Sequence, residues 1–140
     1  MSKLAVVYWS GTGNTEAMAN AVAEGMTAAG AEAELFTAAD FGADKVDAYD
    51  AIAFGCPSMG SEQLEDSEFE PMFNDCKEKL AGKKIGLFGS YGWGDGEWMR
   101  NWKDDCDASG INVAVEPVIC NDAPDADAVA ACQELGKALA

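Results

Sequence analysis

Residues 4–15 constrain the fold and the function more than any other part of the chain. The first half of this segment is apolar enough for a buried strand, and the second half consists only of small hydrogen-bonding residues. Apolar residues then recur at spacings of three and four from Met18 to Ala29, which predicts an amphipathic helix. A strand, a small-residue turn and a helix together favour an anion site, because the first helical turn carries unpaired backbone N–H groups and a partial positive charge.

Two interpretations of this turn stay open when it is considered alone. Ser, Thr, Asn and Gly are common helix-cap residues, so the turn could do no more than cap the helix. Alternatively it binds a phosphate through neutral donors, since no Lys or Arg lies between Ser10 and Thr15. It is not a Walker A loop, which ends in Gly-Lys-Ser/Thr. Nor does Gly11-Thr12-Gly13 have the third glycine of the dinucleotide-binding fingerprint.

The charge of the chain restricts its partners. Twenty-five acidic residues, nine basic residues and no histidine give a formal net charge of −16 over 140 residues. This charge argues against nucleic acid and anionic membranes, and it favours docking onto a basic protein surface. The same charge predicts a monomer. We expect it to be cytoplasmic, because no signal peptide and no membrane-spanning apolar run is recognisable. The five cysteines form no C-x-x-C pair and no metal site, which predicts reduced, mostly buried thiols.

Hydrophobic periodicity predicts five strands that alternate with five helices. The strands are expected at residues 4–9, 32–37, 50–56, 85–90 and 111–119, with Pro117 near the end of the last one. The helices are expected after Thr15, around residues 43–46, and at residues 69–80, 98–106 and 129–139. This alternation predicts a single α/β domain over residues 1–140, with a parallel sheet inside and helices on both faces.

Three unusual loops leave the carboxyl ends of predicted strands, which is where ligands bind in this type of sheet. They comprise residues 10–15, 56–62 and 90–94. The first loop offers phosphate donors, whereas the other two carry large apolar side chains beside glycines, namely Met59, Tyr91 and Trp93. These side chains could cap the sheet as packing, or they could form the walls of a slot for a flat ring. A phosphate together with a flat ring indicates a mononucleotide that carries flavin or adenine.

The three loops resemble the FMN loops of flavodoxins, and they are most similar to the short-chain clostridial type. The matching segments are Tyr8-Trp9-Ser10-Gly11-Thr12-Gly13-Asn14-Thr15, Gly55-Cys56-Pro57-Ser58-Met59-Gly60-Ser61-Glu62 and Leu87-Phe88-Gly89-Ser90-Tyr91-Gly92-Trp93-Gly94. The resemblance covers the full chain and implies a five-stranded parallel sheet in the order 2-1-3-4-5, for which flavodoxin is itself the type example. It also implies a low-potential one-electron carrier rather than an enzyme. Such a carrier uses non-covalent FMN and passes through semiquinone and hydroquinone states between redox enzymes.

The resemblance implies a role for each loop in binding FMN. The phosphate would be held by Ser10, Gly11, Thr12, Gly13, Asn14 and Thr15. The isoalloxazine ring would lie between Met59 and Trp93, and its polar edges would meet Gly60, Gly92, Glu62 and Asn121. The other residues expected at the cofactor are Pro57, Ser58, Ser61, Ser90, Tyr91 and Gly94. Many relatives carry Ser at the position of Pro57, so we expect Ser58 to supply that hydroxyl.

Other functions occur on the same topology. An FMN-dependent quinone or azo reductase is the alternative, but it needs a substrate pocket over the ring, where Trp93 and Met59 are expected to cover both faces. A response-regulator module needs acidic residues after the first and third strands, and positions 8–10 and 55–58 hold none. A low-molecular-weight phosphatase needs a Cys-x5-Arg loop, which the sequence lacks. The expected partners are therefore redox proteins with basic docking surfaces.

Overall fold

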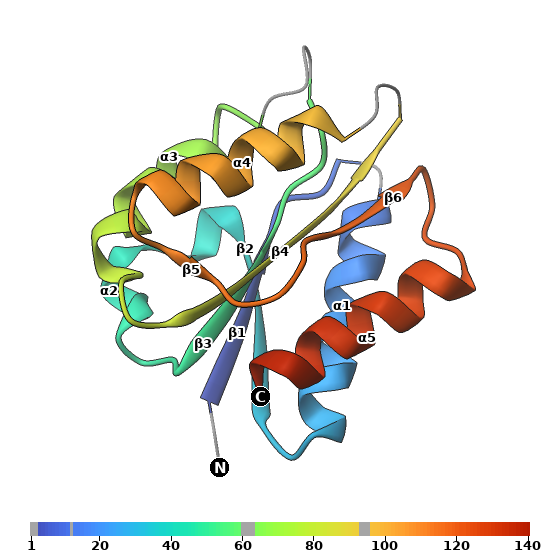
Figure 1. The fold of residues 1–140 in the computed structure, drawn as a ribbon, viewed down its shortest axis with the longest axis horizontal. Coiled ribbons are helices and arrows are strands. Elements are labelled where there is room, and N and C mark those ends of the chain that lie inside the picture. Colours follow the sequence, from blue (N-terminus) through green and yellow to red (C-terminus); the bar gives the residue numbers. More distant parts are fainter. Residues whose placement is uncertain (1–2, 12, 60–63, 93–95) are drawn as a thin grey trace.

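The computed structural model describes residues 3–11, 13–59, 64–92 and 96–140, in which strands and helices alternate along the chain (Figure 1). The strands are β1 (Lys3–Tyr8), β2 (Glu32–Thr37), β3 (Ala51–Gly55), β4 (Lys84–Tyr91), β5 (Asn112–Val113) and β6 (Val118–Asn121). The α-helices are α1 (Asn14–Ala28), α2 (Ala43–Val46), α3 (Phe69–Cys76), α4 (Glu97–Ala108) and α5 (Ala126–Leu139). Two short 3₁₀ helices are η1 (Ala38–Asp40) and η2 (Lys77–Lys79).

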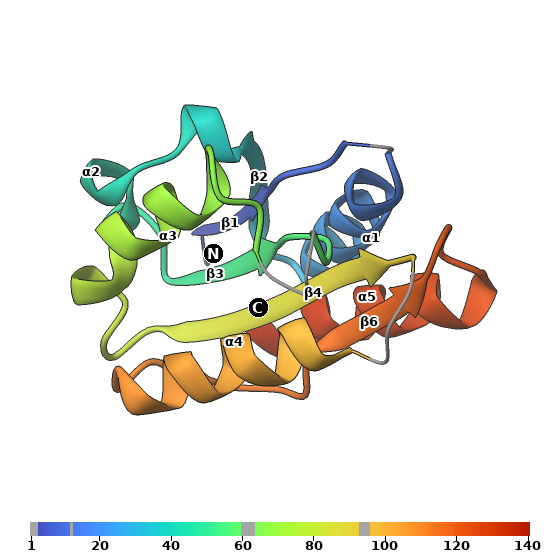
Figure 2. The ribbon, with the colours of Figure 1, turned by 90° about the horizontal axis from the view of Figure 1, so that it is seen from above.

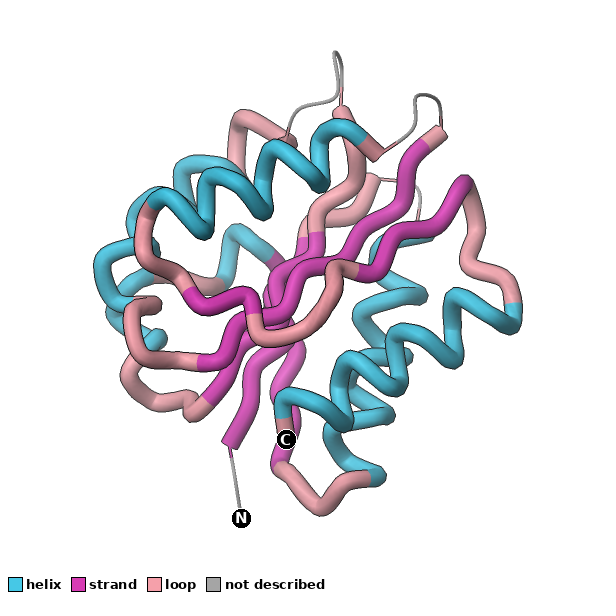
Figure 3. The backbone as a smooth tube through the Cα atoms, in the orientation of Figure 1, coloured by secondary structure: helices cyan, strands magenta, loops and turns pink. Residues whose placement is uncertain are grey.

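The strands form one parallel sheet in the order β2-β1-β3-β4-β5, and β6 pairs with β4 beyond β5. Figure 3 shows them as a central layer with helices on either side. This confirms the predicted fold class and strand order. The register pairs Tyr8 with Gly55, the last residues of β1 and β3, and pairs Tyr91 with Asn121, the last residues of β4 and β6. Gly55 pairs with Phe88, so β4 runs a few residues further than β3. The carboxyl ends of four strands therefore meet along one edge of the sheet.

The prediction of a continuous strand over residues 111–119 is wrong. β5 ends at Val113, and pairing with β4 resumes only at Val118. Pro117 lies in this gap and has no N–H group to donate, so the hydrogen-bond ladder is interrupted there. The two short strands share the fifth position of the sheet, which leaves the order of the strands unchanged. Similarly, the third predicted helix ends as an α-helix at Cys76 and continues as the tighter η2.

Side chains of the central strands alternate between two core clusters, one on each face of the sheet. Leu4 and Val6 pack with apolar residues of α1 and α5, whereas Ala5 and Val7 pack with those of α3 and α4. All four residues are fully buried. Figure 1 shows these two pairs of helices on opposite sides of the sheet. Burial on both faces explains why the central strands are almost continuously apolar.

All five cysteines are free, and four of them are buried, while Cys120 is partly exposed. Burial raises the pKa of Cys76 to about 11 and the pKa values of Cys106 and Cys132 to about 12. These thiols therefore stay protonated and unreactive near neutral pH. In the described part of the chain, none of the helices has the length and apolar character that crossing a bilayer requires.

Candidate functional site

A cavity of about 350 Å³ lies at the carboxyl edge of the sheet, where the register brings β1, β3, β4 and β6 together. Its size falls within the range of small-molecule and cofactor sites, which is about 300–1,000 Å³. Its walls are formed by residues at or just after the carboxyl ends of these strands and by the first turn of α1. They are Trp9, Ser10, Gly11, Asn14, Thr15, Pro57, Ser58, Met59, Ser90, Tyr91, Gly92 and Asp122.

Most of the predicted site residues that the structure describes line this one cavity. Two do not. Gly13 caps α1 with a φ of 94°, and the side-chain amide of Asn121 donates a hydrogen bond to the Tyr91 carbonyl at 3.3 Å. The predictions for Thr12, Gly60, Ser61, Glu62, Trp93 and Gly94 lie outside the described residues. The loops predicted to form a site are thus brought together, and the role of each residue stays a prediction.

Ser10 shows that the capping interpretation of the first loop is partly correct. Its Oγ accepts hydrogen bonds from the backbone N–H groups of Gly13 at 3.0 Å and Glu16 at 3.3 Å. Both lone pairs of the hydroxyl are then in use, while its hydrogen is available to an acceptor in the cavity. The positive φ of Gly13 is a conformation that glycine adopts without steric cost. The loop therefore caps α1 and still presents the Ser10 hydroxyl as a hydrogen-bond donor.

Thr15 shows that capping does not account for the whole loop. Its side chain is 1 % exposed, and its Oγ1 has no hydrogen-bond partner among the described residues. A buried polar group without a partner costs about 1–3 kcal/mol, which a folded protein rarely tolerates without a reason. Because Thr15 lines the cavity in the first turn of α1, a ligand oxygen bound there would satisfy the hydroxyl.

The electrostatics of the cavity suit a phosphate held by neutral donors. Among the described residues that line it, none is basic and Asp122 is acidic. The attraction for an anion comes instead from the amino end of α1, where the backbone N–H groups of Asn14 and Thr15 have no acceptor within the helix. Hydroxyls and glycines around this helix end allow close approach of a phosphate. The donor set therefore fits a phosphate monoester such as that of FMN.

The other side of the cavity is apolar. Met59 is 36 % exposed and lines the cavity, which is consistent with a thioether placed against a ring. Tyr91 also lines the cavity, but its ring packs inward on Trp98 with centroids 5.5 Å apart. Tyr91 therefore lines the cavity and also packs against the core, so both interpretations of the aromatic loop apply to it.

Hydrogen bonds hold the loops around the cavity in place. The N–H of Ser58 donates to the carbonyl of Ser90 at 3.0 Å, which joins the loop after β3 to β4. The hydroxyl of Ser90 donates to the carbonyl of Asp122 at 2.6 Å, and the N–H of Asp122 donates to the carbonyl of Tyr91 at 2.8 Å. The walls of the cavity are thus fixed to one another before any ligand binds.

Glu65 anchors the end of the loop after β3. Its buried carboxylate accepts hydrogen bonds from the hydroxyl of Ser67 and from the backbone N–H groups of Ser67 at 2.9 Å, Glu68 at 2.8 Å and Phe69 at 2.8 Å. Burial alone would raise the pKa of this carboxyl. The hydrogen bonds from Ser67, Phe69 and Glu68 together outweigh burial, so the pKa lies below its ordinary value. Glu65 therefore caps α3 in its ionised form.

Two residues that line the cavity, Trp9 and Asp122, were not predicted from the sequence. Trp9 directly follows β1, and its Nε1 donates to Oε1 of Glu68 at 3.0 Å. Asp122 directly follows β6 and has a φ of 56°, a left-handed conformation that Asp tolerates better than most residues. The rule that ligands bind beyond the carboxyl ends of strands could have identified both.

The fold and the cavity define a flavodoxin-like α/β protein with a ligand site at the carboxyl edge of its sheet. The sequence model of the family described as flavodoxin matches residues 6–136. A flavodoxin from Megasphaera elsdenii is 53% identical over 135 residues, which are 96% of each chain. A flavodoxin from Clostridium beijerinckii is 44% identical over 135 residues, covering 96% of this chain and 97% of the relative.

Structural comparison agrees with the sequence comparisons. The solution structure of two-electron reduced Megasphaera elsdenii flavodoxin matches with a TM-score of 0.89 and 52% identity, covering 97% of each chain. The chain therefore belongs to the flavodoxin family. Flavodoxins are FMN-binding electron carriers that act with redox partner proteins, and they are not enzymes in the catalytic sense. This confirms the predicted class of function and does not favour the alternative quinone or azo reductase.

Proposed function

We propose that residues 1–140 form one FMN-binding domain that carries single electrons at low potential, and that the cavity at the carboxyl edge of the sheet holds the FMN. The observation that carries this assignment is the buried Thr15 hydroxyl, which has no partner among the described residues and lies at the amino end of α1 within the cavity. When bound there, FMN supplies reversible one-electron chemistry.

In this proposal the first loop holds the phosphate. The hydroxyls of Ser10 and Thr15 donate to its oxygens, as do the first-turn N–H groups of α1, and Thr12 and Asn14 extend the donor set. Gly11 and Gly13 let the backbone approach. Pro57 and Ser58 both line the cavity, so Ser58 is placed to supply the hydroxyl that Pro57 lacks. Hydrogen bonds to a charged group are stronger than those between neutral groups, so neutral donors suffice to bind this dianion.

The remaining loops hold the ring in this proposal. Met59 and Trp93 cover its two faces, while Gly60, Gly92 and Glu62 meet its polar edge. Support comes from the described part of these loops, because Met59, Tyr91 and Gly92 line the same cavity as the donors of the first loop. Asn121 and Asp122 follow each other at the end of β6, where Asp122 lines the cavity and Asn121 fixes the Tyr91 carbonyl. Ser61, Ser90 and Gly94 complete the proposed set.

The carboxylates around the cavity account for a low potential. Asp122 lines the cavity itself, and Glu16 and Glu68 line an adjoining cavity of about 270 Å³ that shares Trp9 and Ser10 with it. Among the described residues that line either cavity, none is basic. These carboxylates oppose any added negative charge, which makes reduction less favourable. Each ~1.4 kcal/mol of such repulsion lowers a one-electron potential by ~59 mV.

The net charge of −16 supports two further parts of the proposal, and the free thiols support a third. The partners are redox proteins with basic docking surfaces, because opposite charge accelerates and orients their encounter. The chain works as a monomer, since two copies with this charge repel each other. Its setting is the cytoplasm, where the five free thiols stay reduced.

An FMN titration followed by stepwise reduction tests the proposed function. The purified chain, stripped of flavin, should take up one FMN and turn yellow, and reduction without oxygen should then proceed in two separate one-electron steps. NADH or NADPH with a quinone should give no turnover. A chain that stays colourless with excess FMN would overturn the proposal, and a single two-electron step with quinone turnover would establish the reductase instead.

A further inference from the structure

The indole of Trp98 makes a hydrogen bond that connects α4 to the loop after β3. Trp98 is 1 % exposed, and its Nε1 donates to the carbonyl oxygen of Cys56 at 3.1 Å, across 42 positions of the chain. Figure 2 shows α4 lying along β4, with its first turn near the carboxyl end of that strand. Trp98 is therefore bonded to the start of the loop that lines the cavity, although it is not among the residues that line the cavity itself.

The Cys56 carbonyl has turned out of the plane of the sheet toward α4. A Cβ atom built on Gly89 would lie 2.2 Å from this oxygen and 3.1 Å from the Trp98 ring. Because Cβ bonds point away from the plane of a sheet, an oxygen in that position lies above the sheet face. It has left the ladder and is buried there, and the indole N–H is its hydrogen-bond partner.

The orientation of this carbonyl decides where the next residues go. Cys56 is followed by Pro57, Ser58 and Met59, all of which line the cavity. The Trp98 ring also packs against Tyr91, a wall on the neighbouring loop. Resting on the proposed function, we propose that Trp98 is a positioning residue for FMN. Its N–H fixes the Cys56–Pro57 peptide and its ring supports Tyr91, so FMN affinity depends on an N–H group that does not line the FMN cavity.

Trp102 provides a matched comparison one turn further along α4. It is also buried, at 3 % exposure, and its ring packs edge-on against Phe69 and Phe73 with centroids 5.4 and 5.5 Å away. Its Nε1 has no hydrogen-bond partner among the described residues. Both tryptophans therefore contribute a ring to the same core, and only Trp98 connects its N–H to the loop of the site. Core packing alone predicts similar effects for both.

The experiment compares Trp98→Phe with Trp102→Phe in the full chain. FMN affinity is measured by titration of the flavin-free proteins, and the redox potential of bound FMN is measured for each. Trp98→Phe should weaken FMN binding about tenfold, which corresponds to 1.4 kcal/mol, and should shift the redox potential. Trp102→Phe should keep the affinity within about twofold, because a tolerated packing change far from the cavity leaves the loop in place. If Trp98→Phe does not fold, the benzothiophene isostere of Trp98 replaces it, since this removes only the N–H.

Each outcome decides the proposal. Equal losses of FMN affinity in the two variants, or no loss in either, would overturn the role of the Trp98 N–H. Retained affinity in the benzothiophene isostere would do the same. If the unaltered chain binds FMN and only the Trp98 variants bind it weakly, both the proposed FMN site and the inference stand. An unaltered chain that does not bind FMN would overturn the proposed function, and with it the inference.

Discussion

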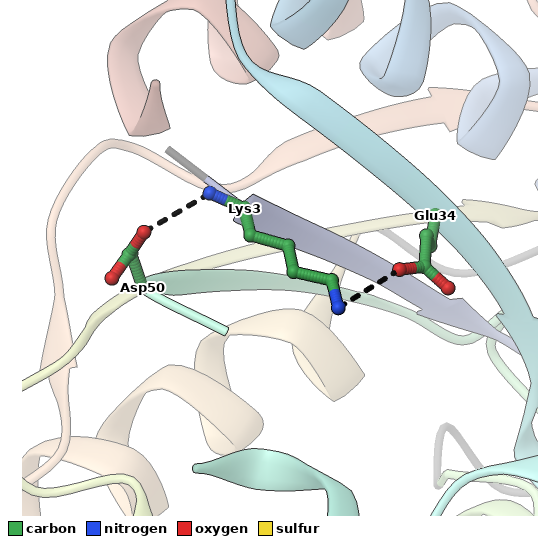
Figure 4. A network of polar contacts seen from close by, with 3 residues as sticks. All are labelled: Lys3, Glu34 and Asp50. Carbon is green, nitrogen blue, oxygen red and sulfur yellow. Dashed lines mark hydrogen bonds and ion pairs between the residues drawn. The ribbon is translucent and has the colours of Figure 1, made fainter. Parts of the chain in front are cut away.

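The two ends of the sheet use polar groups in opposite ways. At the amino end, the backbone N–H of Lys3 donates to Asp50 at 3.0 Å, and its Nζ lies 3.5 Å from Oε1 of Glu34 (Figure 4). The N–H of Asp50 returns a hydrogen bond to the Lys3 carbonyl at 2.8 Å. At the carboxyl end, the Thr15 hydroxyl is buried without a partner among the described residues. Polar groups thus satisfy one another at one end and face a cavity at the other.

This difference shows which end of the sheet contains a polar group that destabilises the ligand-free fold. The groups around Lys3 are half exposed, and ion pairs of this kind contribute only about 0–1 kcal/mol. The group at Thr15 destabilises the ligand-free protein, and a ligand that satisfies it regains that energy as binding energy. Changes at the carboxyl end should therefore affect FMN binding, while changes at the amino end should affect stability alone.

Gly89→Ala should have the largest effect. Its added Cβ would lie 2.2 Å from the Cys56 carbonyl, a backbone atom that cannot rotate away, so we expect a loss of about 3 kcal/mol in the free energy of unfolding. FMN affinity should fall as well. Gly86→Ala on the same strand is the control, because the nearest atoms to its Cβ would be side-chain atoms, with methyl groups of Leu139 and Leu135 at 2.9 and 3.1 Å. Urea unfolding and FMN titration of both variants measure the difference. Equal losses of stability and of FMN affinity in the two variants would contradict this prediction.

Thr15→Val should separate binding from stability. The substitution keeps the shape of the side chain and removes the hydroxyl, so FMN binding should weaken about 10- to 100-fold, as for a lost bond to a charged group. The flavin-free protein should unfold no more easily than before, because a buried group without a partner is gone. Thr27→Val, on an exposed position of α1, serves as the control. A variant that loses stability but keeps its FMN affinity would mean that Thr15 is a core residue only.

Glu65→Gln should lower the free energy of unfolding by about 1 kcal/mol at pH 7, since an ionised cap becomes a neutral one. The pKa of the Glu65 carboxyl lies below its ordinary value in the folded state. Its contribution is therefore complete above the ordinary carboxyl pKa of ~4.3 and is lost as the pH falls through the lower folded value. Unfolding of both proteins at pH 7 and pH 3 should show a smaller difference at pH 3 than at pH 7. A constant difference at both values would argue against an ionised cap.

Lys3→Met should have the smallest effect. It removes the ion pair with Glu34 but keeps the backbone hydrogen bond to Asp50, so the expected loss is below about 0.5 kcal/mol. FMN affinity should not change, because Lys3 lies at the opposite end of β1 from the cavity. Calorimetry of FMN binding provides the check. A change in affinity would contradict the expectation that changes at the amino end of the sheet affect stability alone.

The sequence predicts the strand order and the loops of the site because both depend on local patterns. Alternating apolar runs and glycine-rich turns are visible in a single chain, and residues 10–15 show their donors directly. The interruption at Pro117 has a local cause too, which the apolar run of residues 111–119 concealed. Trp9 was missed because the predicted first strand includes residue 9, whereas β1 ends at Tyr8. Asp122 was missed because the predicted fifth strand ends at residue 119, whereas β6 ends at Asn121.

Other features depend on tertiary contacts and have no local signal. Trp98 and Trp102 belong to the same apolar stripe in the sequence, and nothing in that stripe indicates that only one N–H reaches Cys56. The unsatisfied state of Thr15 likewise follows from what surrounds it in space, because none of the described residues packed around it offers its hydroxyl a partner. Distances between segments far apart in the chain decide both.

A comparison of FMN with riboflavin shows whether the amino end of α1 holds the phosphate. The two ligands share the ring and differ by the phosphate, which the amino end of α1 is proposed to hold with neutral donors. Calorimetric titration of the flavin-free chain should give at least 100-fold tighter binding of FMN, as expected for two or more hydrogen bonds to a charged group. Thr15→Val should reduce that ratio by weakening FMN alone. Equal affinities for the two ligands would mean that the amino end of α1 does not hold the phosphate.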